Sequence, residues 1–150
     1  MKIADELKLV SAIFIDTAPI IYYIESHQKY GPLTREIVTT FQSGELDAFS
    51  SVITLAEVLP KPINKGNKKL ALKFSNFLQY GKNFRLLDIS SGIAERAGKL
   101  RGQYSSLRTI DAIQVSTAID GGADLFITND IRLKQIKEIR VIVLKNYLNE

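Results

Sequence analysis

Residues 12–19 read AIFIDTAP, an apolar run that ends at an acidic residue and is followed at once by a helix signal. Residues 12–15 have the composition of a short buried strand. Pro19 lies near the start of the next segment, where a missing backbone N–H costs a helix least. The same order of strand and then helix recurs along the chain. Further strands are expected at 46–50, 84–89, 125–128 and 141–144, and helices at 17–25, 33–42, 52–59, 70–80, 92–104 and 109–120.

Strands separated by helices predict an α/β fold, a three-layer α/β/α sandwich around a central, mostly parallel sheet. We expect a single domain over residues 1–150, with its core at about 12–144. In such folds, ligands bind beyond the carboxyl ends of the strands. Asp16 follows the first expected strand and Asp130 follows the fourth, so both are expected at that edge of the sheet.

The composition restricts the chemistry. The chain has no cysteine and one histidine, and 45% of its residues are hydrophobic. Disulfides, thiolate zinc sites and cysteine nucleophiles are therefore excluded, and a bound metal must be held mainly by oxygen atoms, which favours Mg²⁺ or Mn²⁺. The first ten residues do not resemble a signal peptide, and no apolar stretch is long enough to span a membrane, so a cytoplasmic location is expected.

Basic residues are unevenly distributed. The formal net charge is +4, but residues 58–87 contain seven lysines and arginines and no acidic residue. Such a block can be a binding surface for a polyanion. It can equally be a solvated, lysine-rich helix face, and this alternative stays open.

Four acidic residues need an explanation. Asp16 and Asp130 can each be explained as the N-cap of the following helix. Glu57 lies in an expected helix that is apolar on nearly every side. A buried carboxylate there would need a cation, a metal ion or an opening to a cleft. The alternative is that Glu57 is exposed on the one polar stripe of that helix.

Asp111 shares a helix face with Val115 and Ala118. The helix dipole favours an acid in the first turn by roughly 0.3–1 kcal/mol, but it does not explain an acid aligned with apolar and small residues. Four carboxylates gathered in one cleft would repel one another, and divalent cations would resolve that repulsion. Pairs of ions about 3.5–4 Å apart are a recurring means of cutting phosphodiesters. His27 is expected in a surface turn and is not needed as a base.

Four short motifs together resemble a known family. They read FIDT at 14–17, SVITLAE at 51–57, TIDA at 109–112 and FITND at 126–130. In this order and spacing they resemble PIN-domain nucleases, and most closely the VapC-type toxins of toxin–antitoxin pairs. The resemblance covers roughly residues 12–144. The chain differs in having about ten residues before its first strand and a lysine-rich segment after Glu57.

The resemblance implies a function and a set of site residues. Asp16, Glu57, Asp111 and Asp130 match the acidic quartet of the family, which is catalytic and holds one or two Mg²⁺ or Mn²⁺ ions. Thr17, Thr54, Thr128 and Asn129 match its polar supporting positions. The family also implies a three-layer α/β/α fold, RNA hydrolysis, a homodimer, and a small antitoxin that covers the active site.

We therefore expect a metal-dependent endoribonuclease that is the toxin of a toxin–antitoxin pair. Expected phosphate contacts come from the basic block and from arginines beside the acids: Lys61, Lys65, Lys68, Lys69, Arg108 and Arg132. Two alternatives stay open: an RNA-processing nuclease without an antitoxin, and a non-catalytic PIN-fold module that binds RNA or protein. The intact acidic quartet argues against the second, because a module without catalysis has no need of four mutually repelling acids.

Overall fold

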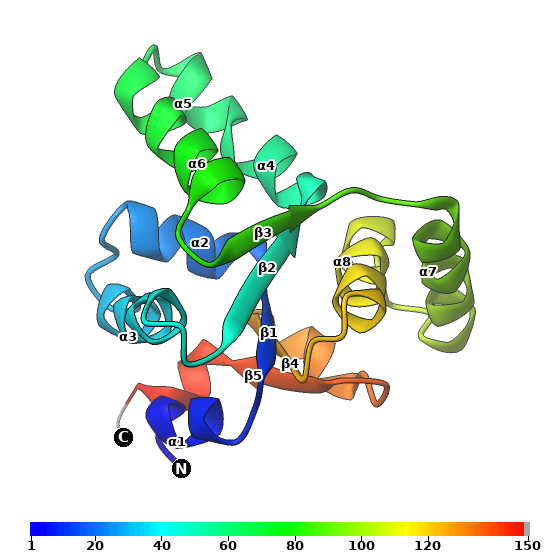
Figure 1. The fold of residues 1–150 in the computed structure, drawn as a ribbon. Helices are drawn as coiled ribbons and strands as arrows, with labels where there is room; N and C mark the ends of the chain where they lie inside the picture. The colour runs from blue at the N-terminus through cyan, green and yellow to red at the C-terminus, as the bar shows by residue number, and fades with distance from the viewer. Residues whose placement is uncertain (149–150) are drawn as a thin grey trace.

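A five-stranded parallel sheet forms the centre of the computed structural model, which describes residues 1–148 (Figure 1). Residues 149–150, the end of the expected domain, lie outside the described residues. The strand order is β3-β2-β1-β4-β5, and every neighbouring pair is parallel. The strands are β1 (Ala12–Ile15), β2 (Asp47–Ser51), β3 (Phe84–Leu87), β4 (Leu125–Thr128) and β5 (Arg140–Val143). The expected sheet is confirmed, and it is parallel throughout these pairs.

The α-helices match the expected segments closely. They are α1 (Ile3–Lys8), α2 (Thr17–Ile24), α3 (Gly31–Gln42), α4 (Val52–Val58), α5 (Pro60–Asn64), α6 (Lys68–Tyr80), α7 (Ser91–Gln103) and α8 (Thr109–Asp120). Helices α1 and α5 were not predicted. A proline inside an apolar helical pattern indicates the end of a helix, so Pro60 and Pro62 indicate only that α4 ends there. Helix α4 does end before Pro60, but proline is tolerated in a first turn, so the same residue begins the next helix.

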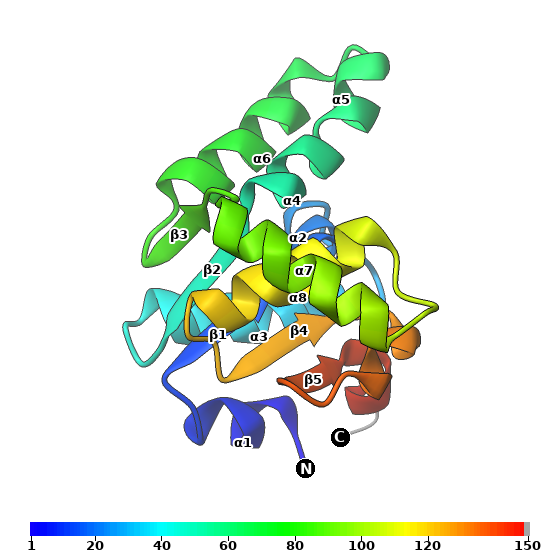
Figure 2. The ribbon, with the colours of Figure 1, turned by 90° about the vertical axis from the view of Figure 1, so that its right-hand side faces the viewer.

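The two faces of the sheet carry separate cores, because successive strand residues point to opposite faces. Ile13 and Ile15 pack with residues of α1, α2, α3, α4 and α6, whereas Phe14 packs with residues of α7 and α8. Figures 1 and 2 show these helices on opposite sides of the sheet. Phe14 stacks on Phe126 with ring centroids 5.0 Å apart and meets Phe49 edge-on at 5.5 Å. The three-layer sandwich is confirmed.

Helix α8 lies unusually close to the sheet at its C-terminal end. A Cβ atom on Gly121, the residue after α8, would lie 2.5 Å from Cε2 of the Phe49 ring. A glycine is therefore required for this close approach. Near its other end, α8 lies at the carboxyl edge of the sheet, where Gln114 contacts Ser51 and Asp16.

Helices α5 and α6 extend beyond the rest of the molecule (Figures 1 and 2). They carry Lys61, Lys65, Lys68 and Lys69, or lie directly beside them, and all four lysines are exposed. Within residues 1–148, no helix is both long enough and apolar enough to cross a membrane.

Candidate active site

Asp16 stands at the carboxyl end of β1 and is the N-cap of α2. Its Oδ1 accepts a hydrogen bond from the backbone N–H of Thr17 at 2.9 Å and lies 3.4 Å from Nε2 of Gln114. Its Oδ2 accepts a hydrogen bond from the hydroxyl of Thr128 at 2.8 Å. The capping explanation is therefore correct, but it covers only one of the bonds that hold this carboxylate.

The environment of Asp16 raises the pKa of its carboxyl group. Burial is the main cause, and the hydrogen bonds from Thr128 and Thr17 act in the opposite direction. The negative charges of Glu57 and Asp111 raise the pKa of Asp16 further. Three acids that are far apart in the sequence are thus close enough to repel one another.

Glu57 lies on α4, and its exposure differs from the expectation. In α4 only Thr54 and Val58 are buried, and Glu57 is exposed. The prediction that Glu57 is buried was wrong, because most of the apolar residues of α4, Val58 excepted, are themselves only partly covered. Its carboxylate is nevertheless held, since the Thr17 hydroxyl donates a hydrogen bond to Oε1 at 2.6 Å.

Asp111 lies in the first turn of α8 and is 7% exposed, as its position among apolar residues predicted. Arg108 makes a two-pronged contact with it, from Nε to Oδ2 at 2.9 Å and from Nη2 to Oδ1 at 3.1 Å. A second guanidinium, that of Arg132, lies 3.5 Å from Oδ2. The buried charge of Asp111 is therefore balanced by arginines.

Asp130 follows β4 and caps the short 3₁₀ helix η1 (Ile131–Gln135), accepting from the backbone N–H of Arg132 at 3.0 Å. The Arg132 side chain also holds it, through Nη2 at 2.5 Å and Nε at 3.1 Å. These hydrogen bonds and the arginine charge lower the pKa of Asp130, against the opposing effect of burial. Arg132 links Asp130 to Asp111.

A buried polar network lies beneath the acids, and its central residue, Gln114, was not predicted. The amide Nε2 of Gln114 donates to Thr54 at 2.8 Å, and its Oε1 accepts a hydrogen bond from Ser51. Gln114, Ser51 and Thr54 are each at most 1% exposed. Thr17 lies 3.3 Å from Thr54, so the network reaches Glu57 through these two hydroxyls. A glutamine one turn after Asp111, on a helix face of apolar and small residues, was the signal available in the sequence.

Three of the four supporting positions contact this assembly: Thr17, Thr54 and Thr128. The fourth, Asn129, has different partners among the described residues. Its Nδ2 donates to the Tyr22 hydroxyl at 3.1 Å, and its Oδ1 accepts from the backbone N–H of Lys145 at 2.9 Å.

The donor chemistry of the four acids suits a hard divalent cation, because all the donors are carboxylate oxygens. Within residues 1–148, however, no group of three or more acidic or histidine side chains lies close enough together to hold one ion. Arg108 and Arg132 hold Asp111 and Asp130 instead. The metal-ligand role of the quartet stays a prediction, and it requires these arginines to move.

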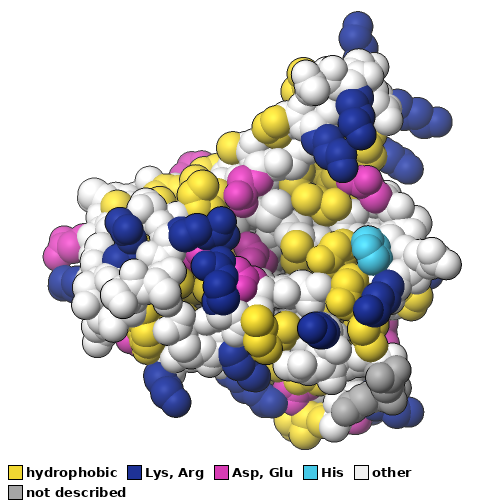
Figure 3. Space-filling model, turned by 180° about the vertical axis from the view of Figure 1, so that it is seen from behind, with side chains coloured by type: hydrophobic (Ala, Val, Ile, Leu, Met, Phe, Trp, Pro, Cys, Tyr) yellow, Lys and Arg dark blue, Asp and Glu magenta, His cyan; other side chains and the backbone are white. Residues whose placement is uncertain are grey.

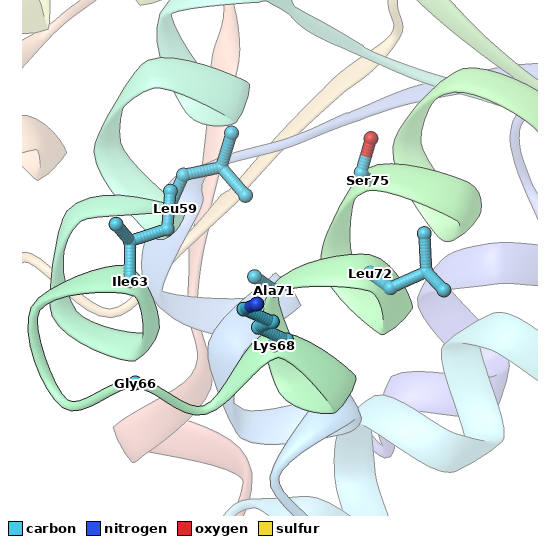
Figure 4. Close-up of a pocket in the computed structure, with 7 residues that line it drawn as sticks. All are labelled: Leu59, Ile63, Gly66, Lys68, Ala71, Leu72 and Ser75. Atoms are coloured by element: carbon cyan, nitrogen blue, oxygen red, sulfur yellow. The ribbon is translucent and has the colours of Figure 1, made fainter.

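The predicted phosphate contacts fall into two places. Arg108 and Arg132 contact the acids, whereas Lys61, Lys65, Lys68 and Lys69 belong to the protruding α5–α6 region. Among residues 1–148, none of these four lysines forms an ion pair with an acidic side chain. An apolar pocket of about 440 Å³ lies between α5 and α6 (Figure 4). It is lined by Leu59, Ile63, Gly66, Lys68, Ala71, Leu72 and Ser75.

Acidic and basic side chains meet on the face shown in Figure 3, beside a histidine and several hydrophobic side chains. His27, the one histidine, is exposed as expected. Because opposite charges meet on this face, it can interact both with cations and with the phosphates of a polyanion.

Comparisons with known proteins agree with the fold. The model of the PIN domain family matches residues 13–139. Among solved structures, DNA-bound VapBC from Salmonella typhimurium has a TM-score of 0.71 and 19% identity, covering 89% of this chain and 98% of that chain. VapBC2 from Rickettsia felis, bound to a promoter DNA fragment, has a TM-score of 0.68 and 21% identity, covering 88% and 98%.

A third solved structure is VapC20 from Mycobacterium tuberculosis, a toxin that cleaves the sarcin–ricin loop. It has a TM-score of 0.65 and 14% identity, covering 85% of this chain and 98% of that chain. No curated protein sequence matches the chain significantly. These structural likenesses establish the fold, and the family model covers most of the sequence. The chain belongs to the PIN domain family.

Proposed function

We propose that this protein is a metal-dependent endoribonuclease and the toxin of a toxin–antitoxin pair, with Asp16, Glu57, Asp111 and Asp130 as its metal-binding carboxylates. The observation that carries the proposal is the meeting of acids from β1, α4 and α8 at one edge of the sheet. The charges of both Glu57 and Asp111 act on Asp16, which is half-buried. A protein without a ligand for these groups gains nothing from that repulsion.

The bound ions, Mg²⁺ or Mn²⁺, would supply an activated water and stabilise the charge that develops on the phosphate. The protein would orient the carboxylates to bind these ions. Thr128 and the Thr17 backbone hold Asp16, the Thr17 hydroxyl holds Glu57, and the Gln114 amide connects the two sides. Hydrolysis in this manner is expected to leave a 5′-phosphate and a 3′-hydroxyl.

Arg108 and Arg132 have two possible partners in this proposal. Both are at the surface, with side chains 66% and 45% exposed, and both already hold carboxylates. Guanidinium groups bind phosphate oxygens in the same two-pronged manner as carboxylates. When RNA is bound, its phosphates can take over these arginines, and Asp111 and Asp130 become available to cations. Binding of RNA and of the ions would then favour each other.

The toxin assignment is supported by the kind of structures that this chain resembles. Two of them are VapBC complexes bound to DNA, and one is described as a toxin that cleaves RNA. By analogy we expect a small antitoxin partner and a homodimer. A direct check is to express the protein alone and together with the product of a short open reading frame next to its gene. Growth arrest that the second product relieves supports the toxin role, and unimpaired growth in both cases argues for an RNA-processing enzyme.

The enzymatic proposal is tested with purified protein and total cellular RNA. We expect no cleavage in EDTA, cleavage when Mg²⁺ or Mn²⁺ is restored, and 5′-phosphate ends on the products. Cleavage that resists EDTA, or products with cyclic phosphate ends, would show that the quartet does not act through metal ions.

A further inference from the structure

Three aromatic rings form a cluster where α2 is joined to α3. They are Tyr22 in α2, His27 in the turn, and Tyr30 immediately before α3. Tyr22 and Tyr30 are stacked with centroids 4.9 Å apart and planes 25° apart. His27 lies 4.7 Å from Tyr22 and 5.2 Å from Tyr30. We call these three residues the aromatic cluster.

The turn itself fixes the aromatic cluster. Nδ1 of His27 accepts hydrogen bonds from the backbone N–H groups of Lys29 and Tyr30, each at 3.1 Å. The imidazole ring is therefore held against the turn and is not free to rotate into solvent. His27 is exposed, and Tyr22 and Tyr30 are half-buried, so the cluster is both fixed and accessible.

A short chain of hydrogen bonds connects the aromatic cluster to the acidic edge. The Tyr22 hydroxyl accepts from Nδ2 of Asn129, the residue directly before Asp130. The other side of the Asn129 amide is held by the backbone N–H of Lys145. The Asn129 side chain, bonded at both ends of its amide, thus connects the aromatic cluster to the residue next to Asp130. In Figure 3 the histidine and neighbouring hydrophobic side chains occupy the same face as several acidic side chains.

The charge around the aromatic cluster favours an anionic ligand. Nζ of Lys29 lies 5.6 Å from the centre of the Tyr30 ring, and the exposed Lys145 is the residue whose backbone N–H holds Asn129. The Tyr22 hydroxyl, being the acceptor of its bond from Asn129, still has its own hydrogen to donate. Aromatic faces, a hydroxyl donor and two lysines form the set of groups that contact an unpaired nucleotide.

We propose that the aromatic cluster binds one unpaired RNA base, stacked on its accessible rings, and so places a neighbouring phosphate at the acidic edge. This inference rests on the proposed ribonuclease function and adds the substrate form, a strand that is unpaired at this nucleotide. Stacking on aromatic side chains is tolerant of sequence, because every base has a π-face. The aromatic cluster would therefore position the RNA strand and contribute little to base specificity.

The test measures binding of two labelled probes of about ten nucleotides in EDTA, which prevents hydrolysis. One is oligoadenylate, and the other is a ribose–phosphate strand of equal length without bases. The variants are Tyr30→Leu, which removes the ring, and Tyr30→Trp, which keeps an aromatic face. Tyr80→Leu is the matched control, because Tyr80 is 79% exposed at the end of α6 and lies outside the cluster.

For oligoadenylate we expect Tyr30→Leu to raise Kd by about fivefold or more, and Tyr30→Trp and Tyr80→Leu to change it by less than about twofold. On the strand without bases, all variants should bind like the wild type, which also excludes misfolding. The chain has no tryptophan, so the single indole of Tyr30→Trp reports stacking through its fluorescence, which only oligoadenylate should change.

Equal loss in Tyr30→Leu and Tyr30→Trp, or a loss of the same size on the strand without bases, would overturn the inference. So would a wild type that binds both probes equally. In each case the ribonuclease proposal stands if the protein still cleaves total RNA with Mg²⁺. Absence of any cleavage with Mg²⁺ or Mn²⁺ contradicts the ribonuclease proposal itself.

Discussion

The side-chain amide of Gln114 bridges Asp16, at 3.4 Å, and Thr54, at 2.8 Å. Its oxygen accepts from Ser51, so both ends of the amide are engaged. The reversed orientation would point the amide oxygen at the Asp16 carboxylate, which has only acceptors when ionised. The network therefore fixes the glutamine, and the glutamine fixes the position of Asp16 relative to α4.

Replacing Gln114 should weaken metal binding more than it weakens folding. We expect Gln114→Met to lower Mn²⁺ affinity and RNA cleavage by about 10–100-fold, as is typical when a group that orients metal ligands is lost. Ser116→Ala is the control, since Ser116 is equally buried in α8 but its hydroxyl bonds, within residues 1–148, only to the Ile93 carbonyl. Calorimetric titration with Mn²⁺ and thermal melts check this. If both variants lose stability alike and neither loses Mn²⁺ affinity, Gln114 has only a structural role.

Replacing Arg132 should separate metal binding from RNA binding. Arg132 holds Asp130 and approaches Asp111, so Arg132→Gln should bind Mn²⁺ more tightly than the wild type when RNA is absent. The same variant should bind RNA more weakly, because a phosphate contact is lost. Arg96→Gln, at an exposed position of α7, is the control. Unchanged or weaker Mn²⁺ binding by Arg132→Gln would show that the arginine does not compete with the ion.

Neutralising Asp16 should stabilise the protein when no metal is bound. Burial raises the pKa of Asp16, so its ionised form is the one that the fold disfavours. An acid of this kind lowers stability at neutral pH, and the cost disappears as pH falls through the raised pKa. Asp16→Asn should therefore raise Tm in EDTA at pH 7, where each kcal/mol corresponds to about 2–4 °C for a chain of this size.

The gain from Asp16→Asn should shrink on acidification, and it should reverse with saturating Mg²⁺ because the variant loses a ligand. Asp130 behaves in the opposite way, since its pKa is lowered and its contribution to stability is lost as pH falls through that value. A Tm that falls in EDTA at pH 7 would contradict the assignment for Asp16.

Neutralising the lysines of the α5–α6 region tests whether they contact phosphate. The triple change Lys65→Gln, Lys68→Gln and Lys69→Gln should reduce the slope of log Kd against log salt by about 2 for single-stranded RNA. Three exposed lysines elsewhere, Lys8, Lys99 and Lys137, provide the matched control. An unchanged slope would mean that this block is only a solvated surface.

Short sequence patterns predicted most of the fold, because most strands and helices are indicated by the residues within them. The apolar run before Asp16, the β-prone run before Asp130 and the strong helix from Thr109 each form the expected element. The same reasoning failed at Glu57, whose exposure depends on how much of α4 is covered by other helices. It also failed at Pro60, because a proline that ends one helix is tolerated in the first turn of the next, here α5.

The supporting side chains of the site depend on contacts between distant segments. Gln114 meets Ser51 and Thr54 across about sixty positions, and Asn129 meets Tyr22 across more than a hundred. Nothing in a single sequence registers such pairs, so the buried network and the bond between Asn129 and Tyr22 emerged only from the structure. The acids could be named beforehand because each follows a strand or stands out on an apolar helix.

The central claim is that the four carboxylates act together to cleave RNA, and Asp111 is the member that tests it most directly. Asp111→Asn should abolish Mg²⁺-dependent cleavage while the protein stays folded, as judged by circular dichroism. Asp120→Asn, at the exposed far end of the same helix, should cleave like the wild type. Cleavage by Asp111→Asn at the wild-type rate would contradict the account.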